Sequence, residues 1–321
     1  MKTALIQSPS EAAEIIRAGG LVAFPTETVF GLGVDATNEA AVQKLFDAKG
    51  RPSTNPLIVH IADAADWSTA AAMLTPSAET LLAEFAPGPL TVVLPKRPEI
   101  SPLVTAGLET VGVRVPDHPV AREVLRLAGT PVAAPSANRS GRPSGTRWRT
   151  VLEDLGGRVD AVYRQDGLSI GVESTVVDCT GPVSTVLRPG AVTLEAIRRI
   201  LPDAREASGE PSSELSDKVR SPGTLHPHYQ PKAEVVLIDS LDAIDLSSGD
   251  IIAYCGMLPV EEDALEFSVV FATLEDYAAG FYEFLREADR RGATLIYIQR
   301  APDQGVGHAL RDRQLRAADE R

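Results

Sequence analysis

The amino-acid sequence predicts an α/β protein with a twisted mixed sheet in a larger domain and a smaller C-terminal Rossmann-like α/β domain. Apolar runs of strand length alternate with helical patterns along most of the chain, which is typical of α/β folds. Some strand patterns follow one another without a helix between them, so parallel and antiparallel neighbours are expected in one sheet. A polar segment then precedes a second, shorter α/β pattern.

Length and composition limit the classes of function. The chain has 321 residues, which favours two domains. Hydrophobic residues make up 44% and charged residues 23%, ordinary values for a globular protein with real cores. The formal net charge is -13, which argues against binding nucleic acid or an anionic membrane over a broad surface. A local cationic pocket remains compatible with this charge.

The cysteines and the N-terminus predict a cytoplasmic protein without membrane contact. Cys179 and Cys255 are far apart and lack metal-ligand spacing, so we expect buried reduced thiols. The apolar run of MKTALIQSPSE breaks at Gln7, so no signal peptide is expected. No run approaches the roughly 18 apolar residues of a membrane span.

Helix-capping signals and β-rich runs define the elements of the larger domain. Pro9 stands at the first helical position of a capping box that ends at Glu11, and Gly19 and Gly50 are expected to end the first two helices. The expected helix N-caps are Ser8, Asn38, Thr75 and Asp117. The expected strands are 21–24, 57–61, 90–94, 111–115, 132–134, 174–179 and 185–187.

Residues 203–222, DAREASGEPSSELSDKVRSP, are polar and have little to bury, so they predict a linker. Three strand patterns and a helix follow; the helix carries Tyr277, Phe281 and Phe284 on one side. The expected elements of this second module are strands 234–238, 251–255 and 294–298 and helix 274–288. The resulting division is 1–202 for the larger domain, 203–231 for the linker and 232–321 for the smaller domain.

Residues 24–61 hold the densest group of polar side chains. A Thr-rich turn follows one strand, and Lys49 and Arg51 bracket a glycine at a helix end before a second strand. Ligands of α/β proteins bind at strand ends, and such cations suit phosphate. Taken alone, Lys49 can equally complement the helix dipole and Arg51 be a surface charge. Replacing either with Ala is expected to leave the fold intact, at a cost of about 0.5 kcal/mol for an exposed position.

Arg114 lies inside the strand pattern VGVRV, on the face opposite its valines. A guanidinium in a half-buried strand needs an anion. Two interpretations stay open: an internal Asp or Glu, or the carboxylate of a substrate held by both arms of the guanidinium.

Other chemistries receive less support. The string GLGVDA after a strand resembles a dinucleotide fingerprint, with Asp63 as a ribose ligand, but four polar residues separate strand and glycines. Glycines that permit a tight turn are the simpler interpretation. There is no G-x-S-x-G elbow and no evident activating base, which excludes serine hydrolase chemistry. His226 and His228 lack a third metal ligand. His60 taken alone is a satisfied core histidine, and an S-x-N pattern taken alone caps a turn.

Several motifs together resemble one family. Three motifs lie close together: PTET with an aromatic residue and GLG at 25–33, K-x-R-P at 49–52, and NPLIVHI at 55–61. They resemble motifs of the YrdC-type threonylcarbamoyl-AMP synthases. S-x-N at 136–138 and S-P-G…H-Y-x-P at 221–231 extend the likeness over nearly the whole chain. The resemblance implies a YrdC-like domain that makes L-threonylcarbamoyladenylate from L-threonine, bicarbonate and ATP and releases pyrophosphate. The product serves the threonylcarbamoyladenosine modification of tRNA.

The resemblance also assigns residues. Lys49 and Arg51 are the implied catalytic cations. The implied threonine ligands are Thr26, His60, Arg114, Ala134 and Ser174, with Arg114 on the carboxylate. The implied nucleotide ligands are Lys49, Arg51, Ser53, Thr110, Ser136, Asn138, Ser144, Arg188 and Tyr229.

The same resemblance implies cofactors and partners. No Walker A loop is present, so ATP is expected to bring Mg²⁺ and to use the dispersed K-x-R and S-x-N residues, without an organic cofactor or a dedicated metal site. Residues 221–231 are expected to form a lid. The expected partners are tRNA threonylcarbamoyl-transfer proteins, with tRNA contact weak or indirect. Phe30 replaces the usual tyrosine, and Leu225–His226 replace an expected basic residue. A module that binds structured RNA is the second class, disfavoured by the acidity.

Overall fold

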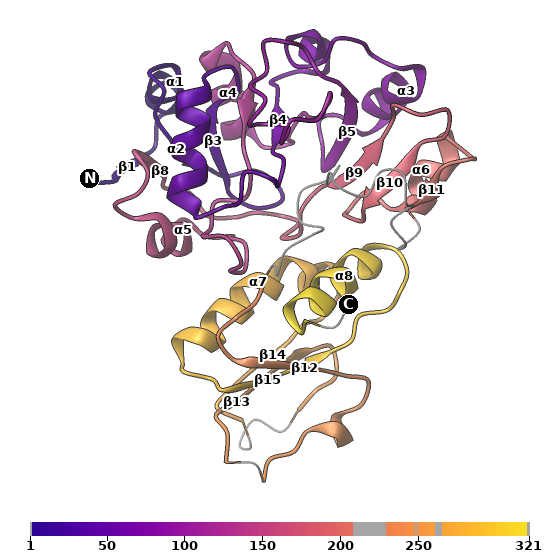
Figure 1. Ribbon diagram of the computed structural model, residues 1–321. Coiled ribbons are helices and arrows are strands. Elements are labelled where there is room, and N and C mark those ends of the chain that lie inside the picture. The colour runs from indigo at the N-terminus through magenta and orange to yellow at the C-terminus, as the bar shows by residue number, and fades with distance from the viewer. Residues whose placement is uncertain (1, 208–228, 248, 261–264, 320–321) are drawn as a thin grey trace.

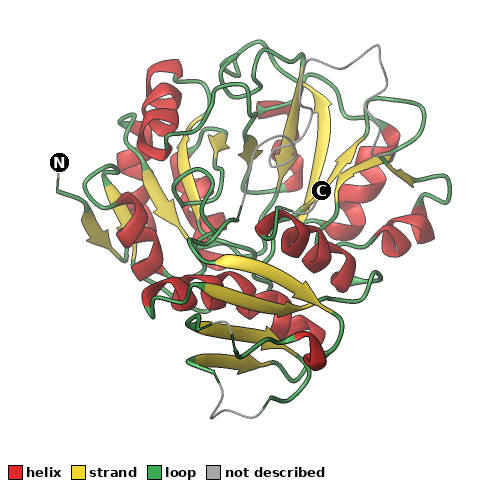
Figure 2. Ribbon diagram, turned by 60° about the horizontal axis from the view of Figure 1, so that its bottom comes forward, coloured by secondary structure: helices red, strands yellow, loops and turns green. Residues whose placement is uncertain are grey.

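The computed structural model describes residues 2–207, 229–247, 249–260 and 265–319. These residues form an eleven-stranded sheet in the larger domain and a four-stranded sheet in the smaller one, and helices flank both sheets (Figure 1 and Figure 2). The predicted α/β class, with a mixed sheet and a smaller C-terminal α/β domain, is confirmed. None of the helices in these ranges is both long and apolar enough to cross a bilayer.

The larger sheet is mixed because several strands connect without a crossover. Its order is β1-β8-β2-β3-β7-β4-β6-β5-β9-β10-β11. Antiparallel pairs such as β2–β3 and β5–β6 alternate with parallel pairs such as β4–β6 and β5–β9. The strands are β1 (Ala4–Ile6), β2 (Val22–Phe24), β3 (Gly31–Asp35), β4 (Ile58–His60), β5 (Leu90–Pro95), β6 (Thr110–Arg114), β7 (Val132–Ala133), β8 (Ala161–Tyr163), β9 (Thr175–Asp178), β10 (Thr185–Arg188) and β11 (Arg205–Glu206).

Helices cover both faces of this sheet. Alternation along β2 sends Ala23 into one core and Phe24 into the other. Helices α1 (Pro9–Arg17) and α4 (Pro119–Ala128) pack on the Phe24 side. The opposite core receives apolar residues of α2 (Glu39–Lys49), α3 (Pro76–Phe85), α5 (Trp148–Leu155) and α6 (Leu194–Ile200). A short 3-10 helix, η1 (Ala64–Thr69), follows β4.

Most predicted helix ends are confirmed. The side chains of Ser8, Asn38 and Thr75 accept hydrogen bonds from backbone N–H groups in the first helical turn. Gly50 ends α2 in the left-handed conformation, φ 61°, which glycine adopts without a Cβ penalty. The predicted cap at Asp117 is wrong, because α4 starts one residue later: its N-cap is His118, which makes no side-chain capping bond.

The GLGVD segment is a strand, not the tight turn expected from its glycines. It forms β3 and pairs antiparallel with β2, so that Gly33 faces Val22. A Cβ atom added to Gly33 would lie 2.5 Å from a ring carbon of Phe24. The glycine therefore permits close packing of an aromatic ring on the neighbouring strand.

Short elements escaped the sequence analysis. Strands β1 and β8 have three residues each, too few for a readable alternation, and α5 and α6 lie in segments that the analysis left unassigned. Residues 205–206, which the analysis places in the linker, form β11 instead, since their backbone pairs with β10 and Ala204 is buried. Residues 208–228 of the predicted linker lie outside the described residues, and with them most of the predicted lid.

The smaller domain is a parallel four-stranded sheet of order β12-β15-β13-β14. Its elements are β12 (Glu234–Ile238), η2 (Leu241–Ala243), β13 (Ile252–Gly256), β14 (Phe267–Val270), α7 (Leu274–Arg290), β15 (Leu295–Gln299) and α8 (Val306–Ala317). Tyr277, Phe281 and Phe284 of α7 are buried, as predicted. Strand β14 and helix α8 were not predicted. Helices α7 and α8 lie between this sheet and the larger domain (Figure 1).

Buried ion pairs fasten the two domains together. Arg286 of α7 donates to Asp154 of α5, with an Nη2–Oδ2 distance of 2.7 Å, and both side chains are almost inaccessible to solvent. Breaking such a pair leaves an uncompensated buried charge. At the rim, His308 of α8 lies 2.9 Å from Glu206 of β11 and 2.5 Å from Asp303.

The His308 contact predicts a pH-dependent stability. Burial alone would lower the pKa of His308, but its bonds to Asp303 and Glu206 outweigh burial and raise it above 6.5; Glu195 is also near. A raised pKa means that the contact stabilises fully below pH 6.5 and fades as pH rises past the folded-state pKa. We expect His308→Gln to lower the melting temperature more at about pH 6 than at about pH 8.5. Equal losses at both pH values would contradict this.

Candidate active site

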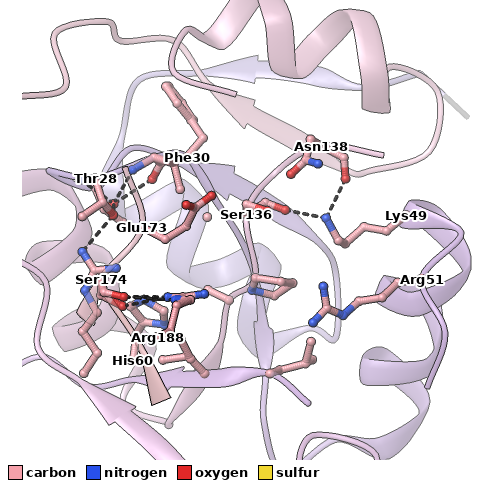
Figure 3. Close-up of a pocket in the computed structure, with 18 of the residues that line it drawn as sticks. Thr28, Phe30, Lys49, Arg51, His60, Ser136, Asn138, Glu173, Ser174 and Arg188 are labelled. Atoms are coloured by element: carbon pink, nitrogen blue, oxygen red, sulfur yellow. Dashed lines mark hydrogen bonds between the residues drawn. The ribbon is translucent and has the colours of Figure 1, made fainter. Parts of the chain in front are cut away.

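One pocket collects most of the predicted site residues. Its wall is formed by the end of α2 and by strands β4 and β6 (Figure 3). Three turns complete the wall: one after β2, one after β7 and one before β9. All predicted site residues except Ser53, Thr110 and Ser144 line it. The lining residues are Thr26, Thr28, Val29, Phe30, Gly31, Lys49, Arg51, Leu57, Ile58, His60, Arg114, Ala134, Pro135, Ser136, Asn138, Ser140, Glu173, Ser174, Arg188 and Tyr229.

Lys49 is a buried residue, not a surface cation. Only 1% of it is exposed. Its Nζ donates to the backbone oxygens of Ser136 and Asn138, both at 2.6 Å (Figure 3). Burial lowers the pKa of Lys49 well below its usual range, and the charge of Arg51 lowers it further. The lysine thus ties the end of α2 to the S-x-N turn, and the expectation that Lys49 occupies an exposed position is wrong.

Arg51 supplies a second cation at the same end of the pocket. Its Nε donates to the Asn55 oxygen at 3.2 Å and its Nη2 to the Pro56 oxygen at 2.9 Å. Burial, with the charge of Arg188, lowers the pKa of Arg51 to about 10, so the guanidinium stays charged at neutral pH. Among the described residues, these two bonds go to neutral carbonyls, which satisfy N–H groups without cancelling the charge, so Arg51 suits an anionic ligand.

The structure answers both interpretations of Arg114. Its Nη2 donates to Glu27 Oε1 at 2.6 Å and to Thr28 Oγ1 at 3.0 Å, so an internal carboxylate exists. Arg114 nevertheless lines the pocket, and its buried Nε has no hydrogen-bond partner among the described residues. Glu27 therefore fixes one edge of the guanidinium and leaves Nε for a further acceptor.

His60 is a neutral imidazole beside this arginine. Burial and the charge of Arg114 lower the pKa of His60 to about 3. Its Nδ1 is buried without a partner among the described residues. The interpretation as a satisfied core histidine is therefore wrong, and the ring offers one polar atom to a neutral or hydroxyl group.

Ser174 and Arg188 form a third group. Arg188 Nη2 donates to the Ser174 carbonyl at 2.9 Å and contacts its Oγ at 3.2 Å, and Thr91 Oγ1 lies 2.8 Å from the same Oγ (Figure 3). Ser174 is fully buried. No base activates its hydroxyl in these contacts, in agreement with the exclusion of serine hydrolase chemistry.

Three predicted ligands lie away from the pocket wall. Ser53 is exposed in the loop after α2. Thr110 lines a neighbouring small cavity together with Gly112 and Val176. Ser144 is buried and donates to Glu173 Oε1 at 2.6 Å. The roles of these residues stay predictions.

Tyr229 is the one described residue of the predicted lid that lines the pocket. It adopts φ 67°, is buried, and packs against Tyr282 of α7 with ring centroids 5.1 Å apart. Burial raises the pKa of Tyr229, so the hydroxyl stays protonated. His226 and His228 lie outside the described residues.

The sequence analysis missed Glu173, Thr28 and Ser140 as lining residues. Glu173 immediately precedes the predicted Ser174, and this adjacency was the available signal. Within the part of the chain that the structure describes, four cations and one carboxylate line the pocket, so it is a cationic site inside a chain of net charge -13.

Two other site types find no support among the described residues. No group of three or more His, Cys, Asp or Glu side chains there is arranged to hold a metal ion. The GLG glycines lie inside β3, so their backbone N–H groups form no phosphate-binding turn before a helix. Asp63, the suggested ribose ligand, instead accepts from Ala65 N at the start of η1.

Two family models match the chain. The Sua5_yciO_yrdC model, described as telomere recombination, matches residues 14–190. A second model, described as the C-terminal domain of threonylcarbamoyl-AMP synthase, matches residues 192–319. Together they cover the smaller sheet and every strand of the larger sheet except β1.

Relatives extend along nearly the full length. A threonylcarbamoyl-AMP synthase of Bacillus subtilis is 42% identical, over 96% of this chain and 92% of its own. The corresponding protein of Pyrococcus abyssi is 39% identical, over 96% and 93%. The crystal structure of P. abyssi Sua5 complexed with L-threonine superposes with a TM-score of 0.90 at 38% identity, covering 98% of this chain and 94% of that one. By its sequence and by its fold, the chain belongs to the Sua5/YciO/YrdC family and is similar along its length to the two-domain threonylcarbamoyl-AMP synthases.

Proposed function

We propose that this protein is an L-threonylcarbamoyladenylate synthase that uses L-threonine, bicarbonate and ATP and releases pyrophosphate. The observation that carries the proposal is the pocket itself, in which four cations, a neutral histidine and several hydroxyls converge in an otherwise acidic chain. The related P. abyssi protein is described in complex with L-threonine, which supports an amino-acid substrate for this pocket.

The Arg114 side of the pocket suits the amino acid. The Nε of Arg114 is available to a carboxylate, and the Glu27 bond keeps the guanidinium from rotating. The free Nδ1 of His60 suits the threonine hydroxyl. Ala134 and Ile58 offer apolar surface for the methyl group. Such convergence fixes the substrate in one orientation and supplies rate through proximity.

The Lys49 side suits the nucleotide phosphates. Lys49 and Arg51 lie at the end of α2 facing the S-x-N turn. Mg²⁺ enters as part of the substrate MgATP, bound to the phosphates. Cations placed where charge develops on a transferring phosphoryl group stabilise the transition state.

The proposed reaction joins the two sides. The threonine amine attacks the carbon of CO₂ and loses a proton, which forms a carbamate. With bicarbonate as the donor, a C–O bond of bicarbonate also breaks, and its hydroxyl leaves with the amine proton as water. A carbamate oxygen then attacks the α-phosphorus of ATP, the bond to the β-phosphate oxygen breaks, and pyrophosphate leaves. Carbamates decompose in water, so burial of the pocket protects the intermediate. No described side chain takes the role of general base.

The downstream role belongs to the same proposal. The adenylate would pass to tRNA threonylcarbamoyl-transfer proteins, with tRNA contact weak or indirect because the net charge of -13 opposes a broad nucleic-acid interface. A cytoplasmic location is consistent with the two free, buried thiols, Cys179 and Cys255.

The first test measures the substrates. We expect pyrophosphate release from ATP to require both L-threonine and bicarbonate, with L-valine as a matched control because a methyl group replaces the hydroxyl in a side chain of nearly the same shape. Pyrophosphate would be followed with a coupled assay and the nucleotide product by chromatography. Equal release without threonine, or ADP as the main product, would overturn the assignment.

Lys49 should affect both stability and ATP binding. Lys49→Met keeps the apolar stem but leaves the carbonyls of Ser136 and Asn138 without their donor. An unsatisfied buried acceptor costs roughly 1–3 kcal/mol, so we expect a loss of that order in urea unfolding together with at least a roughly tenfold weaker ATP affinity by calorimetry. A variant that is destabilised but binds ATP normally would make Lys49 purely structural.

Arg114→Lys should affect threonine selectively. Lysine keeps the charge and can reach Glu27, but it has no second N–H edge for a carboxylate. We expect the KM for threonine to rise roughly tenfold or more while that for ATP changes about twofold or less. Arg97→Lys, in an exposed pair with Glu99, is the matched control. A parallel rise in both KM values would rule out a carboxylate clamp.

A further inference from the structure

Glu173 is the one carboxylate among the described residues that line the pocket. It is 7% exposed and directly precedes Ser174. Figure 3 places it among the labelled pocket residues. A buried carboxylate in a site proposed to bind phosphates requires a reason, because it repels the anionic substrate unless its charge is compensated.

Three donors compensate it, and two of them come from the other domain. Ser144 Oγ donates to Oε1 at 2.6 Å. The Tyr282 hydroxyl of α7 donates to Oε2 at 2.9 Å, and Arg313 Nε of α8 donates to the same oxygen at 3.2 Å. The C-terminal helices therefore reach a residue of the pocket wall.

Arg313 is built into this contact. Its side chain has no solvent exposure, although it belongs to the largest charged residue type. It also donates to the Pro189 oxygen at 2.7 Å, directly after the pocket residue Arg188. Arg313 thus bonds both to Glu173, which precedes Ser174, and to Pro189, which follows Arg188.

The charge of Glu173 follows from these neighbours. Burial alone would raise the pKa of Glu173, but the charges of Arg313 and Arg188 and the Ser144 bond outweigh burial and lower it. The hydroxyls of Tyr282 and Tyr229, whose pKa values are raised, stay neutral around it. A carboxylate held ionised by three donors is a poor proton acceptor and a good anchor.

We propose that Arg313 and Tyr282 of the C-terminal domain are positioning residues: they hold the carboxylate of Glu173, and through it Ser174 and Arg188, in the arrangement that the reaction requires. This inference rests on the proposed function of the same pocket. The C-terminal domain is then part of the active site's support, since two of the three bonds to Glu173 originate in it.

The test compares Tyr282→Phe, Arg313→Met and Glu173→Gln with Arg311→Met. Tyr282→Phe removes one hydroxyl and keeps the ring. Arg311 lies on the same helix, near Asp303, and its variant should match wild type. We expect Arg313→Met to lower kcat roughly tenfold at neutral pH and to lose further activity as pH falls, because Glu173 then becomes protonated. Tyr282→Phe should show a smaller change in the same direction.

A double variant separates positioning from general damage. Glu173→Gln combined with Arg313→Met should lose much less activity than the product of the two single losses, because most of the Arg313 effect passes through the Glu173 charge and only its bonds to Pro189 and Asp312 act separately. Effects that multiply, or an Arg313→Met activity loss without any change in the pH profile, would overturn the proposal. Should Arg313→Met fail to fold, an unchanged pH profile and kcat in Tyr282→Phe would overturn it equally.

A measurement without substrates distinguishes this proposal from the proposed function. In protein labelled with ¹³C-glutamate, the Glu173 carboxyl signal is identified by its loss in Glu173→Gln. Its pKa should be below the usual value in wild type and should rise in Tyr282→Phe. That result stands even if no threonine-dependent pyrophosphate appears. If the pKa of Glu173 is the same in Tyr282→Phe as in wild type, the C-terminal domain does not position this carboxylate and the proposal is refuted.

Discussion

Buried positive charge is the constraint around which this structure is arranged. A cation removed from water must find electron-rich partners in fixed geometry. Lys49 finds two backbone carbonyls, Arg114 finds Glu27, and Arg188 finds the carbonyl of Ser174. Glu27 lies in the turn after β2, Ser136 and Asn138 lie in the turn after β7, and Ser174 lies just before β9. The bonds to the buried cations therefore hold these three turns together as one side of the pocket. The pocket is cationic because most of these partners are neutral carbonyls, which satisfy hydrogen-bond donors without cancelling charge.

The domain arrangement follows from the same constraint. Glu173 and Asp154 are buried carboxylates of the larger domain, and each receives a guanidinium from the C-terminal helices, Arg313 and Arg286 respectively. Asp154 also accepts from Arg139 N in the turn that follows Asn138. Helix α7 thus supports the Lys49 side of the pocket and α8 supports the Glu173 side. Because buried ion pairs join the two domains, the C-terminal domain is expected to move little relative to the larger domain.

The sequence predicted the parts of this molecule that depend on local chemistry. Three of the four predicted N-caps, the glycine that ends α2 at Gly50 and the alternation that places Arg114 opposite its valines all act within a few residues, and they were confirmed. Strands of three residues such as β8 carry too little pattern to recognise. Lys49 was misjudged as exposed because its burial depends on carbonyls 87 and 89 residues away. Glu173 was missed for the same reason, since its partners Tyr282 and Arg313 lie in the other domain and no local motif marks them.

The contrast between an acidic chain and a cationic pocket has a consequence for what can enter. Exposed charges act over about one Debye length, roughly 8–10 Å at physiological salt, so an acidic surface repels a long polyanion along its whole contact. A mononucleotide escapes most of that repulsion once it is inside the pocket, where Lys49 and Arg51 act on it with little screening. Glu173 adds a negative charge on another part of the wall and disfavours phosphate there. The charge distribution therefore favours a small anion in one orientation over a nucleic acid, and it does so without any base-specific contact.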